Sequence, residues 1–264
     1  MLELKEITKT FHPGTVNARR ALDRLSLTLE EGEFVTVIGG NGAGKSTLLN
    51  AVAGAFPIDG GQILLDGQDV THMPEHRRAA FLGRVFQDPM MGTAPTMQID
   101  ENLALAARRG RRRGLKWGVT RAEREEYRAL LAGLGLGLED RMSAKVGLLS
   151  GGQRQALTLL MATVRRPKQL LLDEHTAALD PKTAGKVLEL SQQIVRRDGL
   201  TTLMITHNMK DAIACGSRLI MMDGGRIVLD LAGEEKRRLT VADLLERFSA
   251  VSGREEAEDK LLLS

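Results

Sequence analysis

The sequence predicts an α/β fold built around a parallel sheet, and three observations carry that prediction. Residues Phe34 to Ile38 form an almost continuous apolar run, as expected of a strand buried on both faces. A glycine-rich segment follows and leads into Lys45 to Ala53, whose apolar residues have helical spacing. Two later apolar runs, Gln169 to Leu172 and Thr201 to Thr206, flank a helix predicted from Pro181 to about Arg197. Strands that alternate with helices in this way indicate a parallel sheet.

The composition is that of an ordinary globular protein. The chain has 264 residues, of which 42% are hydrophobic and 27% are charged, so we expect one large domain. Its apolar runs are much shorter than the roughly 20 residues needed to cross a bilayer. Its first residues mix charged and apolar side chains at once, unlike a secretory leader, so we expect a cytoplasmic protein. A single cysteine, Cys215, excludes an intrachain disulfide and a cysteine metal cluster.

The positive charge of the chain is concentrated in one stretch. The formal net charge is only +3, yet one short segment supplies cations without any anion: Arg108, Arg109, Arg111, Arg112, Arg113 and Lys116. The rest of the chain carries a slight excess of acidic residues, which argues against a protein that coats nucleic acid. The stretch predicts either a surface near anionic lipid headgroups or a solvated basic loop.

The remaining elements follow from shorter patterns. Residues 88–164 have helical patterns without strands, including Thr120 to Leu134, where Thr120 and Glu123 have the spacing of a capping box. Two strands joined by Asp223-Gly224-Gly225 predict a hairpin near the C-terminus. In chain order, the other predicted elements are strands at Leu2 to Ile7, Leu25 to Leu29, Arg218 to Met222 and Arg226 to Leu229, and a helix at Val241 to Phe248.

The glycine-rich segment fits G-x-x-x-x-G-K-[ST], the pattern of a phosphate-binding loop, between a buried strand and a helix. Its glycines let main-chain amides turn towards an oxyanion, to which the helix N-terminus adds about half a positive charge. Lys45 is placed to reach the β and γ phosphates and Ser46 to ligate Mg²⁺. A glycine turn that merely permits a tight connection does not explain Lys-Ser after the last glycine. The predicted nucleotide-binding set is Gly39, Gly40, Asn41, Gly42, Ala43, Gly44, Lys45, Ser46 and Thr47.

The second candidate element is an acidic strand end. The apolar run Leu170 to Leu172 is followed by two adjacent carboxylates, Asp173 and Glu174, at the edge of the sheet where ligands of α/β folds collect. Because adjacent strand positions face opposite sides, Asp173 is predicted to hold magnesium and Glu174 to face the attacking water. Glu174 is the predicted general base, a role typically worth about 10² to 10⁴ in rate. Considered alone, the segment could also be a solvated acidic turn.

A third motif, Leu149-Ser150-Gly151-Gly152-Gln153, stands shortly before the acidic strand. Taken alone it could be a helix start with Ser150 as its N-cap. Between the phosphate loop and the acidic strand, it resembles the LSGGQ motif that distinguishes ABC (ATP-binding cassette) ATPases from other phosphate-loop proteins. The resemblance extends from residue 1 to about residue 230.

Several other positions resemble functional residues of that family. Phe11 is similar to the aromatic residue that stacks on adenine, with a core phenylalanine as the alternative. Gln87 resembles the glutamine that contacts magnesium and the attacking water, with a surface glutamine as the alternative. His207 resembles the switch histidine near the γ phosphate, and Ala177 to Asp180 resembles the loop that crosses to the partner subunit. His175 departs from the family pattern, which has proline after the catalytic glutamate.

The resemblance implies a P-loop NTPase (RecA-like) core with an antiparallel β subdomain and an inserted α-helical subdomain. We therefore expect one nucleotide-binding domain over residues 1–250, with a core at 1–87 and 165–232, a helical subdomain at about 88–164 and a charged tail at 251–264. ATP and Mg²⁺ are the implied ligands. A second copy of the chain is also implied, most simply as a C2 homodimer, because the γ phosphate held by Lys45 of one chain is bound by the other chain through Ser150, Gly151, Gly152 and Gln153.

A single free-standing cassette resembles those of bacterial importers, which use integral-membrane permease subunits and an extracytoplasmic substrate-binding protein. Residues 83–95, 113–118, 173–176 and 206–211 resemble cassettes for the uptake of tryptophan, tyrosine or other amino acids. This resemblance implies a peripheral location on the inner face of the cell membrane and no nucleic-acid partner. One alternative is a non-transport ABC ATPase acting on nucleic acid or the ribosome, whose members usually carry tandem cassettes or long insertions. A phosphate-loop kinase is another, which the LSGGQ motif opposes.

Overall fold

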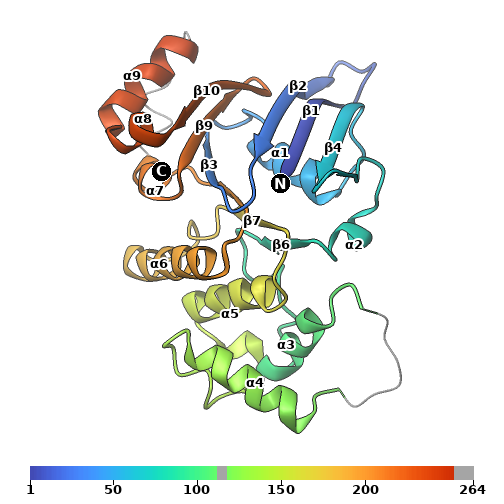
Figure 1. The fold of residues 1–264 in the computed structure, drawn as a ribbon, viewed down its shortest axis with the longest axis vertical. Coiled ribbons are helices and arrows are strands. Elements are labelled where there is room, and N and C mark those ends of the chain that lie inside the picture. The colour runs from blue at the N-terminus through green and yellow to red at the C-terminus, as the bar shows by residue number, and fades with distance from the viewer. Residues whose placement is uncertain (112–117, 253–264) are drawn as a thin grey trace. The chain divides into compact units, whose positions relative to one another are not determined.

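The computed structural model of the chain describes residues 1–111 and 118–252, which divide into two compact units (Figure 1). Unit 1 consists of Met1–Arg78 and Leu200–Ser264, and unit 2 of Ala79–Gly199. None of the helices in the described residues is long and apolar enough to cross a bilayer. Of the predicted tail at 251–264, residues 251 and 252 belong to a helix and residues 253–264 lie outside the described residues. The division at about residues 88 and 164 stays a prediction.

Unit 1 contains an antiparallel sheet with the strand order β2-β1-β4-β5. Each neighbouring pair in it is antiparallel, which confirms the antiparallel β subdomain that the family resemblance implies. The strands are β1 (Leu2–Phe11), β2 (Arg19–Leu29), β4 (Gly60–Leu65) and β5 (Gln68–Asp69). The sequence patterns predicted β1 and β2 but missed β4, because two glycines open that strand and leave only a short apolar run.

The second group of strands in unit 1 contains β3 (Phe34–Ile38), which pairs in parallel with both β8 (Thr202–Ile205) and β9 (Arg218–Asp223). All residues of β3 are buried, as its continuous apolar run predicted. Strand β10 (Arg226–Ala232) pairs with β9 as a hairpin. The turn between them has positive φ at both glycines, 53° at Gly224 and 79° at Gly225, a conformation that glycine adopts without steric cost.

The helices of unit 1 pack on these strands. They are α1 (Lys45–Ala53), α2 (Glu75–Arg78), α7 (Met209–Ala214), α8 (Gly233–Arg237) and α9 (Val241–Ser252). Figure 1 shows α8 and α9 beside β9 and β10. One buried cluster joins β3 and β9 to these helices through Ile38, Met221, Leu244 and Phe248. Helix α1 begins and ends where the sequence predicted, and Gly54 closes it with a φ of 79°.

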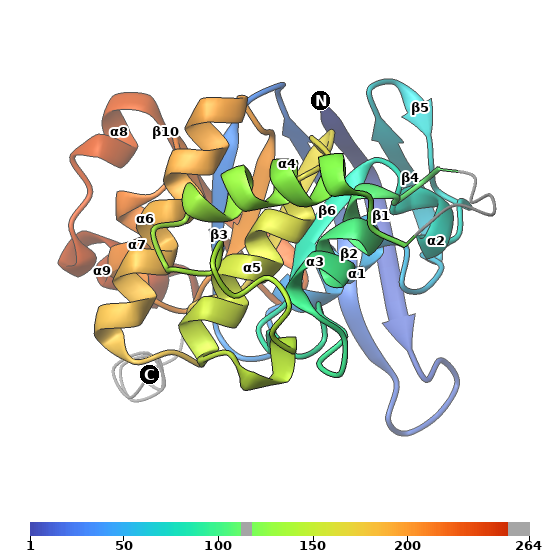
Figure 2. The same ribbon diagram turned by 90° about the horizontal axis from the view of Figure 1, so that it is seen from below.

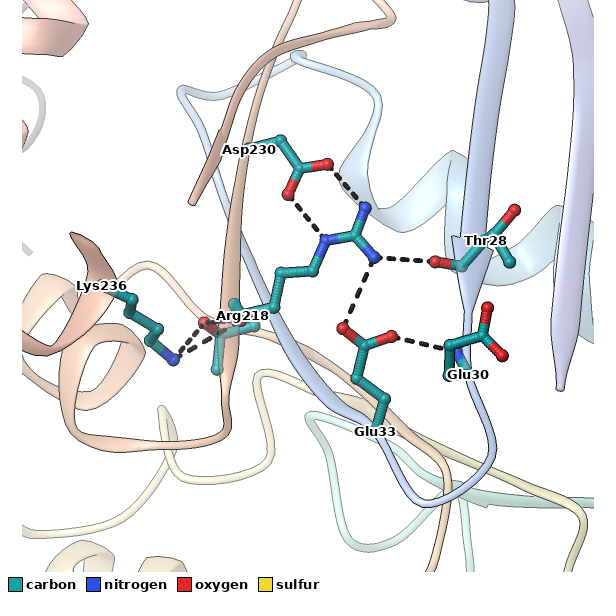
Figure 3. Close-up of polar contacts among 7 residues, drawn as sticks. Thr28, Glu30, Glu33, Arg218, Asp230 and Lys236 are labelled. Atoms are coloured by element: carbon teal, nitrogen blue, oxygen red, sulfur yellow. Dashed lines mark hydrogen bonds and ion pairs between the residues drawn. The ribbon is translucent and has the colours of Figure 1, made fainter. Parts of the chain in front are cut away.

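A single guanidinium connects four segments of unit 1 (Figure 3). Arg218 on β9 donates to both carboxylate oxygens of Asp230 on β10, each at 2.6 Å. It also donates to the carbonyl oxygen of Thr28 on β2 at 2.8 Å and lies 3.5 Å from Glu33, just before β3. The hydrogen bond to Asp230 raises the pKa of Arg218, so the cation is permanent. Arg218 therefore joins β9 to β10, to β2 and to the residue before β3. Strand β3 leads into the glycine-rich loop.

Unit 2 combines two parallel strands with a helical layer. The strands are β6 (Leu82–Val85) and β7 (Gln169–Asp173). The helices are α3 (Ile99–Ala107), α4 (Arg121–Ala132), α5 (Gly151–Thr163), α6 (Pro181–Asp198) and the short 3-10 helix Val146–Leu148. Figure 2 shows α4 crossing α5, and α5 contacts α3, α4 and α6. The structure confirms the predicted capping box of α4, in which Thr120 and Glu123 bond each other's main-chain N–H.

The core of unit 2 lies among its helices. Its fully or almost fully buried side chains include Ile99, Leu103, Tyr127, Leu131, Leu138 and Leu157. Strand β6 was not predicted, because Leu82 to Val85 contains a glycine and an arginine and has no apolar run. An isolated bridge between Gln98 and Lys145 lies in this predicted helical region.

Two cations of the basic stretch make internal contacts in unit 2. Arg108 lies 2.9 Å from Glu123, and Arg109 donates to the carbonyl oxygens of Ala162 and Arg165 at 3.1 and 3.0 Å. Burial lowers the pKa of Arg109. Arg112, Arg113 and Lys116 lie outside the described residues. Part of the stretch therefore serves the packing of unit 2 rather than a basic surface.

Candidate functional site

The phosphate loop of unit 1 is shaped by three glycines with positive φ. Gly39, Gly42 and Gly44 have φ values of 150°, 81° and 101°. A Cβ atom at Gly39 would lie 2.2 Å from the carbonyl oxygen of Met222, and one at Gly44 would lie 2.4 Å from that of Ala21. Both neighbours are main-chain atoms that cannot move aside. The loop therefore needs glycine at these positions for its backbone path and for space.

Contacts from outside the loop hold its carbonyl groups. Arg19 donates to the carbonyl oxygen of Gly42 at 2.9 Å, and the N–H of Gly225 donates to that of Ala43 at 3.0 Å. The Lys45 ammonium, in a residue only 8% exposed, donates to the carbonyl oxygens of Gly39 at 2.7 Å and Gly40 at 3.2 Å. The main chain of the loop is thus held in a defined path, and the Lys45 ammonium lies against its carbonyl oxygens.

Helix α1 starts directly from this loop without the usual capping. Its N-cap is Gly44, and among the described residues no side chain caps this helix start. Its first turn contains no acidic residue either. Ser46 is exposed and Thr47 is half-buried in that first turn. The positive dipole end of α1 at this start therefore favours an anion.

His207 leaves the sheet at the same edge as the phosphate loop. Strands β3 and β8 are parallel, with Val37 paired to Ile205, and the N–H of Thr206 donates to the carbonyl oxygen of Val37 at 3.1 Å. Because the carboxyl ends of parallel strands meet at one edge, the half-buried His207 and Gly39 both follow that edge. Burial raises the pKa of Asp211, an effect that the nearby His207 opposes.

Phe11 lies at the end of β1, away from the hydrophobic core. It is half-buried and packs edge-to-face on Phe56, with ring centroids 5.4 Å apart. The Lys9 ammonium lies 5.7 Å from the centroid of the Phe11 ring. In the β1–β2 pairing Phe11 is opposite Arg19, the residue that contacts the phosphate loop. Phe11 is therefore adjacent to Arg19, which contacts the loop.

The acidic strand end belongs to unit 2, together with Gln87. Strands β6 and β7 are parallel, with Val85 paired to Leu172, so the exposed Gln87 and the half-buried Asp173 leave them at the same edge. Arg84 lies 3.2 Å from the carboxylate of Asp173, and its guanidinium stacks 4.4 Å from the centre of the Phe86 ring. The sequence did not reveal this ion pair, because its partners are 89 residues apart.

Glu174 follows the strand with a different backbone conformation. Strand β7 ends at Asp173, and Glu174 has a φ of 43°. The alternation of side chains along a strand, from which the directions of Asp173 and Glu174 were predicted, therefore stops at Asp173. The N–H of Ala177 donates to the carbonyl oxygen of Glu174 at 3.0 Å and closes a turn. The direction of the Glu174 side chain is thus set by this turn.

His175, the residue that departs from the family pattern, is buried with an exposure of 2%. Its Nε2 lies 2.9 Å from the hydroxyl of Ser191 on α6. Burial lowers the pKa of His175 to about 4, so the imidazole is neutral near pH 7. Neither the sequence pattern nor the family resemblance gave His175 a role.

The LSGGQ segment begins α5 in unit 2. Ser150 is its N-cap: the N–H of Gln153 donates to the Ser150 hydroxyl at 3.3 Å, and the N–H of Ser150 donates to the Gln153 side chain at 3.2 Å. A Cβ atom at Gly152 would lie 2.1 Å from the methyl group of Thr183 on α6. A groove of about 490 Å³ borders Ser150, Gly152 and Gln153. The motif is therefore a stable helix start that faces open space.

Comparison with known proteins agrees with this geometry. The sequence profile described as "ABC transporter" matches residues 22–177, a range that contains the phosphate loop, the LSGGQ segment and the acidic strand end. The chain belongs to the ABC transporter family. ABC ATPases bind and hydrolyse ATP, and this chain is accordingly an ATP-binding and ATP-hydrolysing transport subunit with the P-loop NTPase fold.

Individual relatives of this ABC subunit cover most of its length. It is 47% identical over 248 residues to the tyrosine transport ATP-binding protein of Clostridioides difficile (strain R20291), covering 94% of this chain and 98% of that protein. It is 38% identical over 211 residues to the methionine import ATP-binding protein MetN of Rhizobium johnstonii, covering 79% of this chain and 56% of MetN. The ATP-binding cassette MJ0796 was solved as a dimer in a post-hydrolysis state bound to ADP and Pi. Its structure matches this chain with a TM-score of 0.75 and 29% identity, over 88% of this chain and 98% of that one.

Proposed function

We propose that this chain is the ATP-hydrolysing subunit of a bacterial importer for an amino acid or a related small solute. The observation that carries the proposal is the phosphate loop between β3 and α1, with its glycine-dependent path and uncapped helix start. The relative with 47% identity is named for tyrosine transport, which supports an aromatic amino acid as the first substrate to test.

The proposed nucleotide contacts in unit 1 follow from the geometry of the loop. The main-chain amides of residues 39–47 bind the phosphates, and the Lys45 ammonium moves from its present carbonyl acceptors to the β and γ phosphates. Phe11 stacks on adenine, since its ring is half-buried at the end of β1. His207 contacts the γ phosphate from the strand next to β3.

The proposed hydrolytic residues are Glu174, Gln87 and His207. Glu174 takes the proton from the attacking water, while Gln87 and His207 orient that water and the γ phosphate. Magnesium, when bound, neutralises charge on the phosphates. The hydroxyl of Ser46, the amide oxygen of Gln87 and the carboxylate of Asp173 would hold it, and this set of oxygen donors suits Mg²⁺. Arg84, which lies 3.2 Å from Asp173, would orient that carboxylate.

A second copy of the chain is proposed to complete each site. The chain carries one Lys45 loop and one LSGGQ segment, and Ser150, Gly151, Gly152 and Gln153 would meet the γ phosphate of the partner chain. The dimer of MJ0796 supports this arrangement. Permease subunits in the membrane, and through them an extracytoplasmic substrate-binding protein, are the other proposed partners. They would place the chain on the inner face of the cell membrane.

The glutamate variant Glu174→Gln tests the proposed hydrolysis. It keeps the size and polarity of the side chain but cannot accept a proton, so we expect hydrolysis to fall by about 10² to 10⁴ while ATP binding persists. The measurement is steady-state phosphate release together with nucleotide affinity and oligomeric state, which should shift to a trapped dimer with ATP. Turnover near the wild-type rate would rule Glu174 out as the base.

The substrate is tested separately from the hydrolysis. Uptake of labelled tyrosine should stop in cells whose chain carries Glu174→Gln and continue in cells with the wild-type chain. Uptake of tryptophan and of methionine in the same cells gives the comparison. If none of these amino acids loses its uptake, an amino acid is the wrong class of substrate, although the ATPase assignment stands.

A further inference from the structure

The main chain turns sharply directly after β7. Glu174 has a φ of 43°, a left-handed conformation that is strained for a residue other than glycine. The turn that follows is closed by the N–H of Ala177 on the Glu174 carbonyl oxygen at 3.0 Å. A strained conformation of this kind persists only where the surrounding structure holds it. A contact that holds this conformation is therefore expected from a residue beside Glu174.

His175 makes this contact. Its side chain is 2% exposed, and its Nε2 lies 2.9 Å from the hydroxyl of Ser191, which is fully buried on α6. A hydrogen bond shielded from water is electrostatically stronger than one at the surface. The bond ties the residue after Glu174 to the middle of an 18-residue helix, which is a rigid support.

The bonds of Ser191 determine which imidazole nitrogen carries the proton. A serine hydroxyl has one hydrogen to donate, and the Ser191 hydroxyl donates it to the carbonyl oxygen of Val187 at 2.8 Å. Its oxygen must then accept from His175, which assigns the hydrogen to Nε2. The result is a directed chain from the His175 imidazole through Ser191 to the main chain of α6.

A proline at position 175 would act differently. Proline pushes the preceding residue towards extended backbone, away from the φ of 43° at Glu174. It also has no side-chain donor for Ser191. Histidine lets Glu174 adopt its left-handed conformation and supplies a hydrogen bond to a residue 16 positions along the chain.

We infer that His175 is a positioning residue for ATP hydrolysis in this chain, which acts through Ser191 to hold the main chain of Glu174 in its left-handed conformation and so fixes the direction of the Glu174 side chain. This inference rests on the proposed role of Glu174 as the general base. His175 itself touches neither water nor nucleotide in this account. Loss of the His175 side chain should lower kcat. The affinity for ATP should stay unchanged, because residues 39–47 bind the phosphates.

The first test compares three substitutions of His175. A displacement of a catalytic group by about 1 Å can cost on the order of 10² in rate, so His175→Ala should lower kcat for hydrolysis by about that factor with KM nearly unchanged. His175→Gln places an N–H near the position of Nε2 and should recover most of the rate. His175→Asn has an amide too short to reach Ser191, and it should behave like His175→Ala.

The second test removes the acceptor and uses a matched control. Ser191→Ala deletes the hydroxyl on α6 and should lower kcat in the same direction as His175→Ala. Thr163→Val removes another buried hydroxyl, which bonds to the carbonyl oxygens of its own helix at Leu159 (2.9 Å) and Leu160 (3.3 Å). It should leave kcat at the wild-type value. Thermal unfolding of each variant, run beside the assays, shows that the chain is folded.

The outcomes separate this inference from the proposed function. If Glu174→Gln abolishes hydrolysis but Ser191→Ala and His175→Ala both leave kcat unchanged, the positioning role of His175 is wrong and the general base stands. If His175→Gln recovers no more rate than His175→Asn, the hydrogen bond to Ser191 is not the cause. If Glu174→Gln keeps the wild-type rate, the proposed base itself fails.

Discussion

Helices α1 and α5 both start at glycine-containing motifs, but their first turns differ in side-chain capping. Helix α1 starts at Gly44, with no capping side chain among the described residues and no acidic residue in its first turn. Helix α5 starts at Ser150, and its capping box with Gln153 satisfies main-chain N–H groups at that end. Each helix end carries a partial positive charge, but in the described residues a side chain caps the start of α5 and none caps that of α1.

This difference shows how the two motifs divide the work of binding phosphate. The loop before α1 is held from outside, by Arg19 and Gly225 on its carbonyl groups, and its path depends on glycines with positive φ. The start of α5 is stable without a ligand, since Ser150 caps it, and it is exposed. The first site is therefore expected to bind ATP in the single chain, and the second to act only when another molecule presents a phosphate to it.

The largest effect should come from filling the space beside Gly44. A Cβ atom there would lie 2.4 Å from the carbonyl oxygen of Ala21, at a φ of 101°. We expect Gly44→Ala to abolish ATP binding and to destabilise unit 1 by about 3 kcal/mol or more. Gly14→Ala is the matched control, because Gly14 has a φ of 78° but no described atom lies within 4 Å of its Cβ position. It should cost only about 1 kcal/mol. Equal losses of thermal stability in the two variants would mean that the close approach to the Ala21 carbonyl oxygen is not what requires glycine at position 44.

The next effect distinguishes the capping boxes of α4 and α5 in unit 2. Ser150→Ala and Thr120→Ala each remove a capping hydroxyl, so each should lower the free energy of unfolding by about 1 kcal/mol. Only Ser150 is proposed to meet a phosphate, and its loss should also lower hydrolysis by about 10² or more. Phosphate release and urea unfolding of both variants measure the two effects. An equal loss of hydrolysis in Thr120→Ala would show that helix stability alone explains the result.

The smallest effect concerns a second buried lysine, which serves the fold. Like Lys45, Lys236 donates to main-chain carbonyl groups, those of Cys215, Gly216 and Arg218 among them. Burial lowers the pKa of Lys236 from 10.5 to about 8. Between these two values the unfolded chain binds more protons than the folded chain, so stability should rise with pH across that window, by on the order of 2 kcal/mol.

Lys236→Met gives the control for this pH dependence. The variant has no ammonium, so the rise in stability between about pH 8 and 10.5 should disappear. ATP affinity at pH 7 should stay at the wild-type value, in contrast to a change at Lys45. Denaturant unfolding at a series of pH values measures the slope. The same slope in both proteins would show that other groups cause it.

The elements that the sequence predicted best are those whose signals are local. Strand β3 and helix α1 begin and end at the predicted residues, because a continuous apolar run and a terminal glycine mark their limits. The hairpin between β9 and β10 was marked by its two glycines. Strands β4 and β6 were missed, since each is short and contains glycine, and each pairs with a strand distant in sequence.

Residues that support the site were missed for the same physical reason. Arg84 reaches Asp173 across two paired strands, and His175 reaches Ser191 on the following helix. Such pairs depend on tertiary packing, which leaves no periodic pattern in one sequence. The phosphate loop itself was predicted because its function needs consecutive residues. The roles given to Phe11, Gln87 and His207 came from resemblance and stay predictions.

The most direct test of a shared site mixes two inactive variants. Lys45→Ala lacks the phosphate-loop ammonium, and Ser150→Ala lacks the LSGGQ hydroxyl, so each alone should hydrolyse ATP very slowly. If each site takes Lys45 from one chain and Ser150 from the other, a mixed dimer contains one intact site. An equal mixture should then recover about a quarter of the wild-type rate, because about half of the dimers are mixed. No recovery, in a mixture shown to contain mixed dimers, would contradict the proposal that two chains share each site.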